Sequence, residues 1–294
     1  MGINRRTFLK GLGVGIAGIA PGSSLLPGRV EAADTPASKE FMGVLVDTTR
    51  CAGCRSCEAA CAEAHNLPIP DISNTEVFEK NRPTSETQLT VVNRYQTDKG
   101  ELFAKRQCMH CNQPGCVAAC PVKAMQKMKE GPVTWDTNCI GCRYCMVSCP
   151  FDIPKFEHSA FPKLQKCNLC WERLQKGEKP ACVEACPAEA LTFGTRRELV
   201  EEANTRIYKT PKEYISHIYG EHEAGGTGYL YLSSVPFEQI GFRNDLGTIA
   251  YPEYTKGFLY SVPVVLLLWP AFLSGVSAIT KRKENVRSEE GGKR

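Results

Sequence analysis

The sequence is poor in the features that mark several large classes of protein. It contains only five histidines, and none is spaced from another as paired metal ligands are. Its formal charge of +4 comes from its tails: residues 1–32 and 281–294 carry +3 each, so the body, residues 33–280, carries −2. A face that binds nucleic acid needs its positive charge on the folded domain, so nucleic acid is not expected as a partner. The body also contains no GxGxxG loop of the dinucleotide-binding kind.

Cysteine is the residue that the sequence has in excess. The chain contains 16 cysteines, and all of them fall into four groups of four. The first and third groups have the CxxCxxCxxxC spacing of bacterial ferredoxins. The second group has a wider middle gap, and the fourth has eleven residues between its two pairs. In chain order the groups are Cys51, Cys54, Cys57 and Cys61; Cys108, Cys111, Cys116 and Cys120; Cys139, Cys142, Cys145 and Cys149; Cys167, Cys170, Cys182 and Cys186.

This spacing favours iron-sulfur clusters over the other uses of cysteine. Disulfide geometry is hard to satisfy when three thiols crowd onto one turn, and zinc favours two CxxC pairs well apart in sequence. Zinc fits parts of the fourth group, so a zinc-bound structural scaffold in the membrane is the alternative from another class. In two-cluster ferredoxins the fourth cysteine of each group ligates the other cluster, so groups work in pairs. The remaining possibility is that each group holds its own cluster.

The N-terminus predicts export of the chain. Residues 1–32 contain Arg5-Arg6 followed by Phe8-Leu9, then a weakly apolar run and a small-residue cleavage site at Val30-x-Ala32. This is the pattern of a twin-arginine signal peptide, and that export route carries proteins that are already folded around their cofactors. The mature chain is therefore expected in the periplasm.

The C-terminus predicts a membrane anchor. Residues 257–280 form an uncharged stretch of 24 residues, which is long enough to span a bilayer as a helix. A basic tail, 281–294, follows, and the positive-inside rule places it in the cytoplasm. We therefore expect the body to lie at the periplasmic face of the inner membrane, held by a single C-terminal transmembrane helix.

Short β-type runs lie next to the cysteine groups and predict an α+β fold of tandem ferredoxin-like units with insertions. Runs at 43–47 and 133–136 precede the first and third groups, and a run at 190–193 follows the fourth. Alternating residues around Asp98-Lys99-Gly100 predict a hairpin between the first two groups.

The rest of the body predicts few further elements. Residues 196–207 have the pattern of an amphipathic helix, and 229–233 the pattern of one more strand. The expected organisation is a four-cluster domain at 42–200 and an extension at 201–256 that packs on it. The signal peptide precedes these segments, and the span and basic tail follow them.

With its cysteine groups in this order, the chain resembles the four-cluster ferredoxin-like electron-transfer subunits of bacterial respiratory oxidoreductases. The resemblance covers about residues 42–257 and includes the phrases Cys108-Met-His-Cys111 and Phe193-Gly194-Thr195-Arg196. A twin-arginine signal of its own, combined with one C-terminal span, looks most like the hydrogenase-2 type (HybA-like) subunit. Formate dehydrogenase β subunits are the next most similar type.

In these subunits the first group pairs with the fourth, and the second with the third. The resemblance therefore implies four 4Fe-4S clusters, each held by three cysteines of one group and one of another. Carried onto this sequence, the sets are Cys51, Cys54, Cys57 and Cys186; Cys61, Cys167, Cys170 and Cys182; Cys108, Cys111, Cys116 and Cys149; Cys120, Cys139, Cys142 and Cys145.

The resemblance implies an electron relay rather than a complete enzyme. Electrons would pass between a catalytic subunit, expected to be a nickel-iron uptake hydrogenase, and an integral membrane subunit that reacts with quinone. A formate dehydrogenase or another molybdopterin oxidoreductase is the alternative partner. No cysteine is left over for a nickel-iron centre, so no catalytic centre is expected in this chain. Lysines near the cysteines, such as Lys123, Lys166 and Lys179, could raise the potential of a cluster by their charge, but the expectation for them is a position at the solvated surface.

Overall fold

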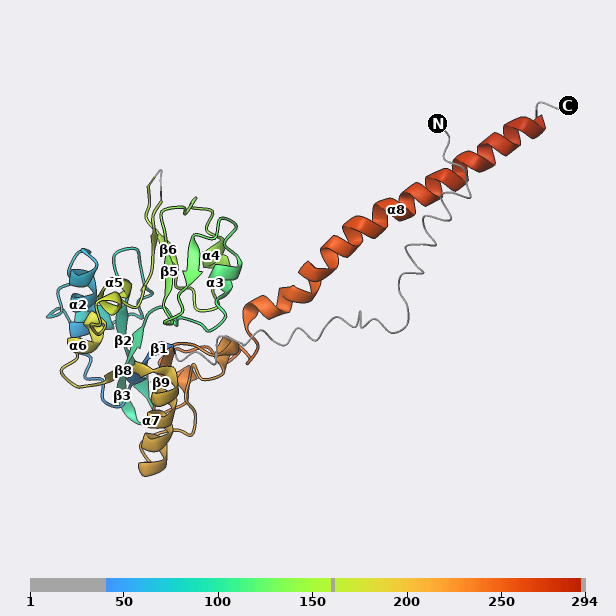
Figure 1. Ribbon diagram of the computed structural model, residues 1–294. Coiled ribbons are helices and arrows are strands. Elements are labelled where there is room, and N and C mark those ends of the chain that lie inside the picture. The colour runs from blue at the N-terminus through green and yellow to red at the C-terminus, as the bar shows by residue number, and fades with distance from the viewer. Residues whose placement is uncertain (1–40, 160–161, 292–294) are drawn as a thin grey trace. The chain divides into compact units, whose positions relative to one another are not determined.

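The described part of the chain is a body of short strands and helices followed by one long helix (Figure 1). The computed structural model describes residues 41–159 and 162–291. The predicted signal peptide, with Arg5 and Arg6, lies outside the described residues. The mixed helix and strand content agrees with the expected α+β class.

A three-stranded sheet joins the two ends of the cysteine-bearing region. Its strands are β1 (Met42–Asp47), β8 (Leu191–Thr195) and β9 (Tyr229–Leu232), in the order β8-β1-β9. β8 is antiparallel to β1 and β9 is parallel to it, and Figure 1 shows the three side by side. Because β1 is the central strand and is covered on both faces, its sequence is a continuous apolar run rather than an alternating one.

Three antiparallel strand pairs complete the β structure. β2 (Val91–Thr97) and β3 (Gly100–Arg106) form the predicted hairpin, with Thr97 opposite Gly100 at its turn. β4 (Met125–Lys127) pairs with β5 (Val133–Trp135) between the second and third cysteine groups. The last pair consists of β6 (Lys155–Phe156) and β7 (Leu164–Gln165).

Short helices follow the cysteine loops, and four of them contact one another in pairs. The helices are α2 (Ser56–Ala64), α3 (Gly115–Ala118), α4 (Tyr144–Val147), α5 (Trp171–Gln175) and α6 (Ala181–Glu184). The helix of the first group, α2, lies against α6 of the fourth group, and α3 of the second group lies against α4 of the third (Figure 1). The 3-10 turns are η2 (Glu76–Phe78), η3 (Glu223–Gly225) and η4 (Phe237–Ile240).

The helix α7 (Arg196–Lys209) covers the sheet, and it confirms the amphipathic helix expected from 196 onward. It starts with a capping box, in which the side chain of Thr195 accepts from the Glu198 amide and Glu198 in turn accepts from the Thr195 amide. Its apolar side packs on strand residues of both β1 and β9. The boundary predicted between the four-cluster domain, 42–200, and the extension, 201–256, falls inside this helix. The strand β9, which lies in the extension, pairs with β1 of the four-cluster domain.

The long helix α8 (Tyr251–Gly291) begins before the predicted span at 257–280 and continues past it. Its stretch Tyr251–Lys283 is the one helix among the described residues that is long and apolar enough to cross a membrane, judged by length and composition. Pro263 and Pro270 lie inside it. Proline disrupts the interior of a helix in water but is tolerated in a membrane helix. Its leucine, valine and aromatic side chains are exposed, as a surface in contact with lipid would be.

Candidate functional site

All four cysteine loops share one backbone feature. The residue directly before the second cysteine is left-handed in each loop, with φ of 69° at Gly53, 49° at His110, 69° at Gly141 and 58° at Leu169. Glycine adopts this conformation freely, whereas a histidine or leucine held there stores strain of the kind that is common at functional sites. The four loops are therefore repeats of one structure, although only two of them carry the glycine that marks it in the sequence.

The chain beyond the fourth cysteine repeats as well. Proline follows Cys120, Cys149 and Cys186, and the third residue after each of these cysteines is again left-handed: φ is 55° at Lys123, 51° at Asp152 and 48° at Glu189. The preceding helices, α3, α4 and α6, each end before the cysteine because a residue before proline avoids the helical region. The first group has Ala62 in place of proline, and there α2 continues through Cys61 to Ala64.

The first and fourth groups bring their cysteines together in two sets. One of them, the Cys51 set, lines a single cavity, and its members are Cys51, Cys54, Cys57 and Cys186. In the other set, burial raises the pKa of Cys61 well above its usual value, and neighbouring thiols raise it further; those thiols are Cys167, Cys182 and Cys170. Each set thus combines cysteines from both groups, which agrees with the contact between α2 and α6.

The second and third groups form two sets in the same way. One of them is the Cys108 set, which consists of Cys108, Cys111, Cys116 and Cys149. Burial raises the pKa of Cys111, and the three neighbouring thiols of this set raise it further. The remaining cysteines form the Cys120 set and line a second cavity; they are Cys120, Cys139, Cys142 and Cys145. Burial, followed by the thiols of Cys139 and Cys142, raises the pKa of Cys145 to about 11.

The chemistry of these sets suits a multi-iron cluster. All 16 cysteines are free thiols, and buried thiols with raised pKa values are neutral unless a metal compensates their negative charge. Among residues 41–159 and 162–291, no group of three or more histidine, cysteine, aspartate or glutamate side chains is arranged to hold a single metal ion. Zinc needs four ligands around one point, whereas a 4Fe-4S cluster spreads four thiolates around its corners. The two cavities, each lined by four cysteines, fit the second case.

Main-chain amides also donate hydrogen bonds to cysteine sulfurs. The amide of Leu169 lies 3.4 Å from Sγ of Cys167, and the amide of Met125 lies 3.5 Å from Sγ of Cys120. Such bonds stabilise negative charge on a sulfur, and they are one of the means by which a protein sets the potential of a cluster.

Two lysines near the cysteines are buried, and the sequence-based expectation for Lys166 was wrong. Lys166 and Lys105 are each 2% exposed, and Nζ of Lys166 lies 3.8 Å from Sγ of Cys108. Lys123 and Lys179 are exposed, as expected. Cys108, Val133 and Trp135, which contact Lys166, are at least 31 positions away in the sequence, so the residues next to Lys166 do not indicate that it is buried.

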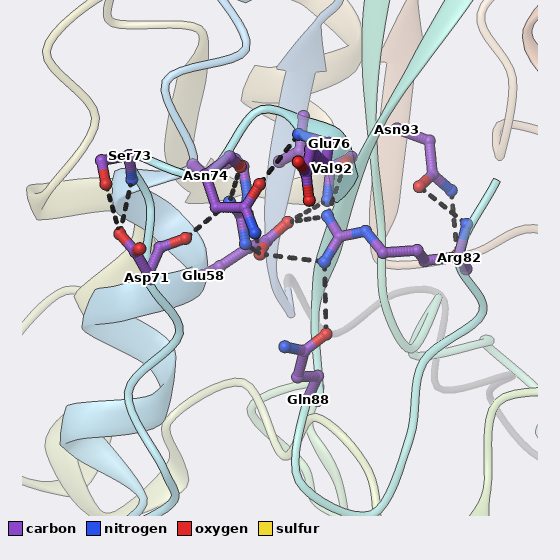
Figure 2. A network of polar contacts seen from close by, with 10 residues as sticks. Glu58, Asp71, Ser73, Asn74, Glu76, Arg82, Gln88, Val92 and Asn93 are labelled. Atoms are coloured by element: carbon purple, nitrogen blue, oxygen red, sulfur yellow. Dashed lines mark hydrogen bonds and ion pairs between the residues drawn. The ribbon is translucent and has the colours of Figure 1, made fainter. Parts of the chain in front are cut away.

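A buried ionic network braces the first cysteine group, and sequence reasoning missed it. Figure 2 shows the carboxylate of Glu58 against the guanidinium of Arg82, with a contact of 2.7 Å, and the same carboxylate accepts a hydrogen bond from the Val92 amide at 2.6 Å. Arg55, itself left-handed, pairs with Glu58 at 3.0 Å and donates to the carbonyl oxygens of Asp71 and Asn74. The network therefore ties the loop of Cys54 and Cys57 to the insertion that follows and to β2.

Exposure differs among the cysteines. Two of them are exposed: Cys54, which belongs to the Cys51 set, and Cys142, which belongs to the Cys120 set. Large apolar side chains surround Cys142 in sequence and are exposed themselves, namely Ile140, Tyr144 and Val147. An exposed apolar cluster of this kind is typical of a surface that contacts another protein.

Comparisons with known proteins agree with the iron-sulfur character of the chain. The profile of a 4Fe-4S dicluster domain matches residues 100–196. The hydrogenase-2 operon protein HybA of Escherichia coli O157:H7 is 36% identical, with 99% of this chain and 98% of that protein covered. A protein of Nitratidesulfovibrio vulgaris is 49% identical over 98% of this chain and 80% of its own length.

A formate dehydrogenase subunit is also related. The nitrate-inducible iron-sulfur subunit of Escherichia coli K12 is 35% identical over 66% of this chain and 68% of that protein. The similarity to HybA thus covers nearly the whole chain, whereas the similarity to the formate dehydrogenase subunit covers about two thirds of it. With its 16 cysteines, the chain belongs to the HybA-type family of four-cluster ferredoxin-like subunits that transfer electrons in respiratory oxidoreductases.

Proposed function

We propose that the chain relays electrons at the periplasmic face of the inner membrane, between a nickel-iron uptake hydrogenase and a membrane subunit that reacts with quinone. The observation that carries this proposal is the pair of exposed cysteines, Cys54 and Cys142, which belong to different sets and give the relay two ends. The clusters supply the one-electron chemistry, and the chain supplies their spacing, surroundings and docking faces. The full-length similarity to HybA supports the hydrogenase partner over formate dehydrogenase.

In this proposal the Cys142 end meets the membrane partner. The second cysteine group lies close to the start of the apolar helix, because a Cβ on Gly115 would lie 3.6 Å from Cβ of Tyr251. The exposed apolar residues Ile140, Tyr144 and Val147 are then the docking face. The Cys54 end is left for the catalytic subunit. The basic tail after Lys281 supports the orientation with a cytoplasmic C-terminus.

The cysteine assignment is part of the proposal: two interleaved ferredoxin-like units, with the sets named above as ligands. Two double variants test it. Under interleaving, Cys51→Ser with Cys186→Ser removes ligands of one cluster, whereas Cys182→Ser with Cys186→Ser removes ligands of two. If each group held its own cluster, these outcomes would be exchanged. Iron and sulfide content, with electron paramagnetic resonance of the reduced protein, distinguishes the two cases.

The partner is tested in membranes that lack this chain. Hydrogen-dependent quinone reduction should be lost, and formate-dependent quinone reduction should be kept. Loss of the formate-dependent activity alone would contradict the hydrogenase assignment and favour the formate dehydrogenase alternative. A purified protein that is colourless and holds zinc instead of iron would overturn the relay itself.

A further inference from the structure

Two lysine side chains are buried in the body without a carboxylate partner. Lys105 lies on β3 and Lys166 directly precedes Cys167, and each is 2% exposed. Within residues 41–159 and 162–291, no ion pair joins either lysine to an aspartate or glutamate. Burying an unpaired ammonium is costly, so a negative charge of another kind must compensate these two.

Nζ of Lys166 has three acceptors around it, and one of them is a cysteine sulfur. This Nζ donates to the carbonyl oxygens of Val133 and Cys167 and lies 3.8 Å from Sγ of Cys108. These three acceptors match the three N–H groups of an ammonium, whereas a neutral amine has only two. The ring of Trp135, with its centroid 5.1 Å from Nζ, covers a further side of the charge.

Lys105 is fixed between two cysteine sets. Its Nζ donates to Oε1 of Gln107 at 2.9 Å, and Gln107 in turn donates to the hydroxyl of Tyr231. Lys105 lines the cavity of the Cys51 set, and its electrostatic neighbours Cys57 and Cys182 belong to the two different sets of the first and fourth groups. Its position is therefore shared by both sets.

We infer that Lys105 and Lys166 act as internal positive charges that raise the reduction potentials of three of the four clusters. Lys166 acts on the cluster of the Cys108 set, and Lys105 acts on the two clusters of the first and fourth groups. A 4Fe-4S cluster with four thiolates is an anion that becomes more negative when it takes up an electron, so a fixed positive charge beside it favours the reduced state. The inference rests on the proposed assignment of cysteines to clusters.

The cluster of the Cys120 set differs from the other three, because the lysine next to its cysteines is not buried. The lysine that follows Cys120, Lys123, is exposed, so water screens its charge. The relay would then have three clusters whose potentials are raised from within and one, at the exposed Cys142 end, whose potential is set by solvent and by the docked partner.

The test is a redox titration of the full-length protein, followed by electron paramagnetic resonance. Lys166→Met should lower the midpoint potential of the Cys108-set cluster by the equivalent of about a tenfold change in its one-electron equilibrium constant, or about 59 mV. Lys105→Met should lower the potentials of two other clusters. Lys123→Met is the matched control and should change none. The cysteine variants described above assign the two signals of the first and fourth groups, and Cys116→Ser assigns the signal of the Cys108 set.

A second variant covers the case in which the methionine variants do not assemble. Gln107→Glu keeps Lys105 in place and puts a carboxylate where Oε1 now accepts from Nζ, so it should lower the same two potentials as Lys105→Met. Intact clusters with unchanged potentials in these variants would overturn the inference and leave the relay standing. Loss of the clusters in both Lys105→Met and Gln107→Glu would also overturn it, in favour of a role in assembly. Absence of clusters from the unaltered protein would instead contradict the proposed function.

Discussion

The two halves of the cysteine-bearing body are built from the same loop but are stabilised differently. In the half formed by the first and fourth groups, the buried carboxylate of Glu58 connects a cysteine loop to an insertion and a hairpin. In the half formed by the second and third groups, two short strands, β4 and β5, join the groups, and apolar residues beside Cys142 face solvent. The repeated loop thus fixes the geometry of the cysteines, and the segments between the groups decide whether a half is closed or left open for a partner.

The largest expected effect comes from breaking the brace of the first half. Glu58→Ala leaves Arg55 and Arg82 without their shared carboxylate, and removing one partner of a buried ion pair costs about 3–5 kcal/mol. The midpoint of guanidinium denaturation, followed by loss of cluster absorbance, measures this change. Glu184→Ala removes an exposed ion pair with Arg173 and is the control, with an expected cost below about 1 kcal/mol. Equal costs for the two variants would contradict the role of the brace.

A smaller loss of stability is expected when alanine replaces the glycine in either of the two cysteine loops that carry one, and the loss should differ between the two loops. Gly53 and Gly141 have the same φ of 69°, so alanine at either should cost about 1–2 kcal/mol in backbone strain. A Cβ on Gly53 would lie 2.5 Å from the ring of Phe103, whereas on Gly141 it would lie 3.1 Å from Pro162. Overpacking of the ring adds about 1–3 kcal/mol, so Gly53→Ala should be the less stable variant. Melting temperatures of the two proteins with clusters bound test this order, and the reverse order would refute it.

The smallest effect on stability is expected at the open face of the second half. Val147 is 86% exposed, so Val147→Ser should change the free energy of unfolding by no more than about 0.5 kcal/mol. If this face docks the membrane partner, the same change should weaken the complex by about 1 kcal/mol and slow quinone reduction. Ile69, 62% exposed in the other half, offers the control, because Ile69→Ser should leave the rate unchanged. An identical rate in both variants would argue against docking at Val147.

Much of the fold followed from local pattern. The hairpin around Asp98-Lys99-Gly100, the helix from Arg196 and the strand from Tyr229 were all predicted, because alternation, capping residues and turn residues act over a few positions. Two left-handed residues in the cysteine loops, His110 and Leu169, carry no such signal, since their conformation is imposed by the surrounding structure.

The buried charges were not predictable in the same way. Lys166 was expected at the surface because lysine usually is, and the network of Glu58, Arg55 and Arg82 joins residues up to 27 positions apart. The periodicity of the sequence does not reveal such partners, because the group that contacts a buried charge comes from a distant segment of the chain. A buried lysine becomes evident only when the distant chain segments that cover it are in place.

The sequence by itself determined the number and kind of the cysteine groups, the apolar C-terminal helix and most of the secondary structure, because each of these depends on short spacings and on composition. The tertiary structure decided which thiols face one another, which lysines lose contact with water and which cysteines reach the surface. Those properties depend on contacts between segments far apart in the chain, such as α2 with α6 and α3 with α4. The physical reason is that ligand geometry is encoded locally, whereas burial and electrostatic environment are set by the whole fold.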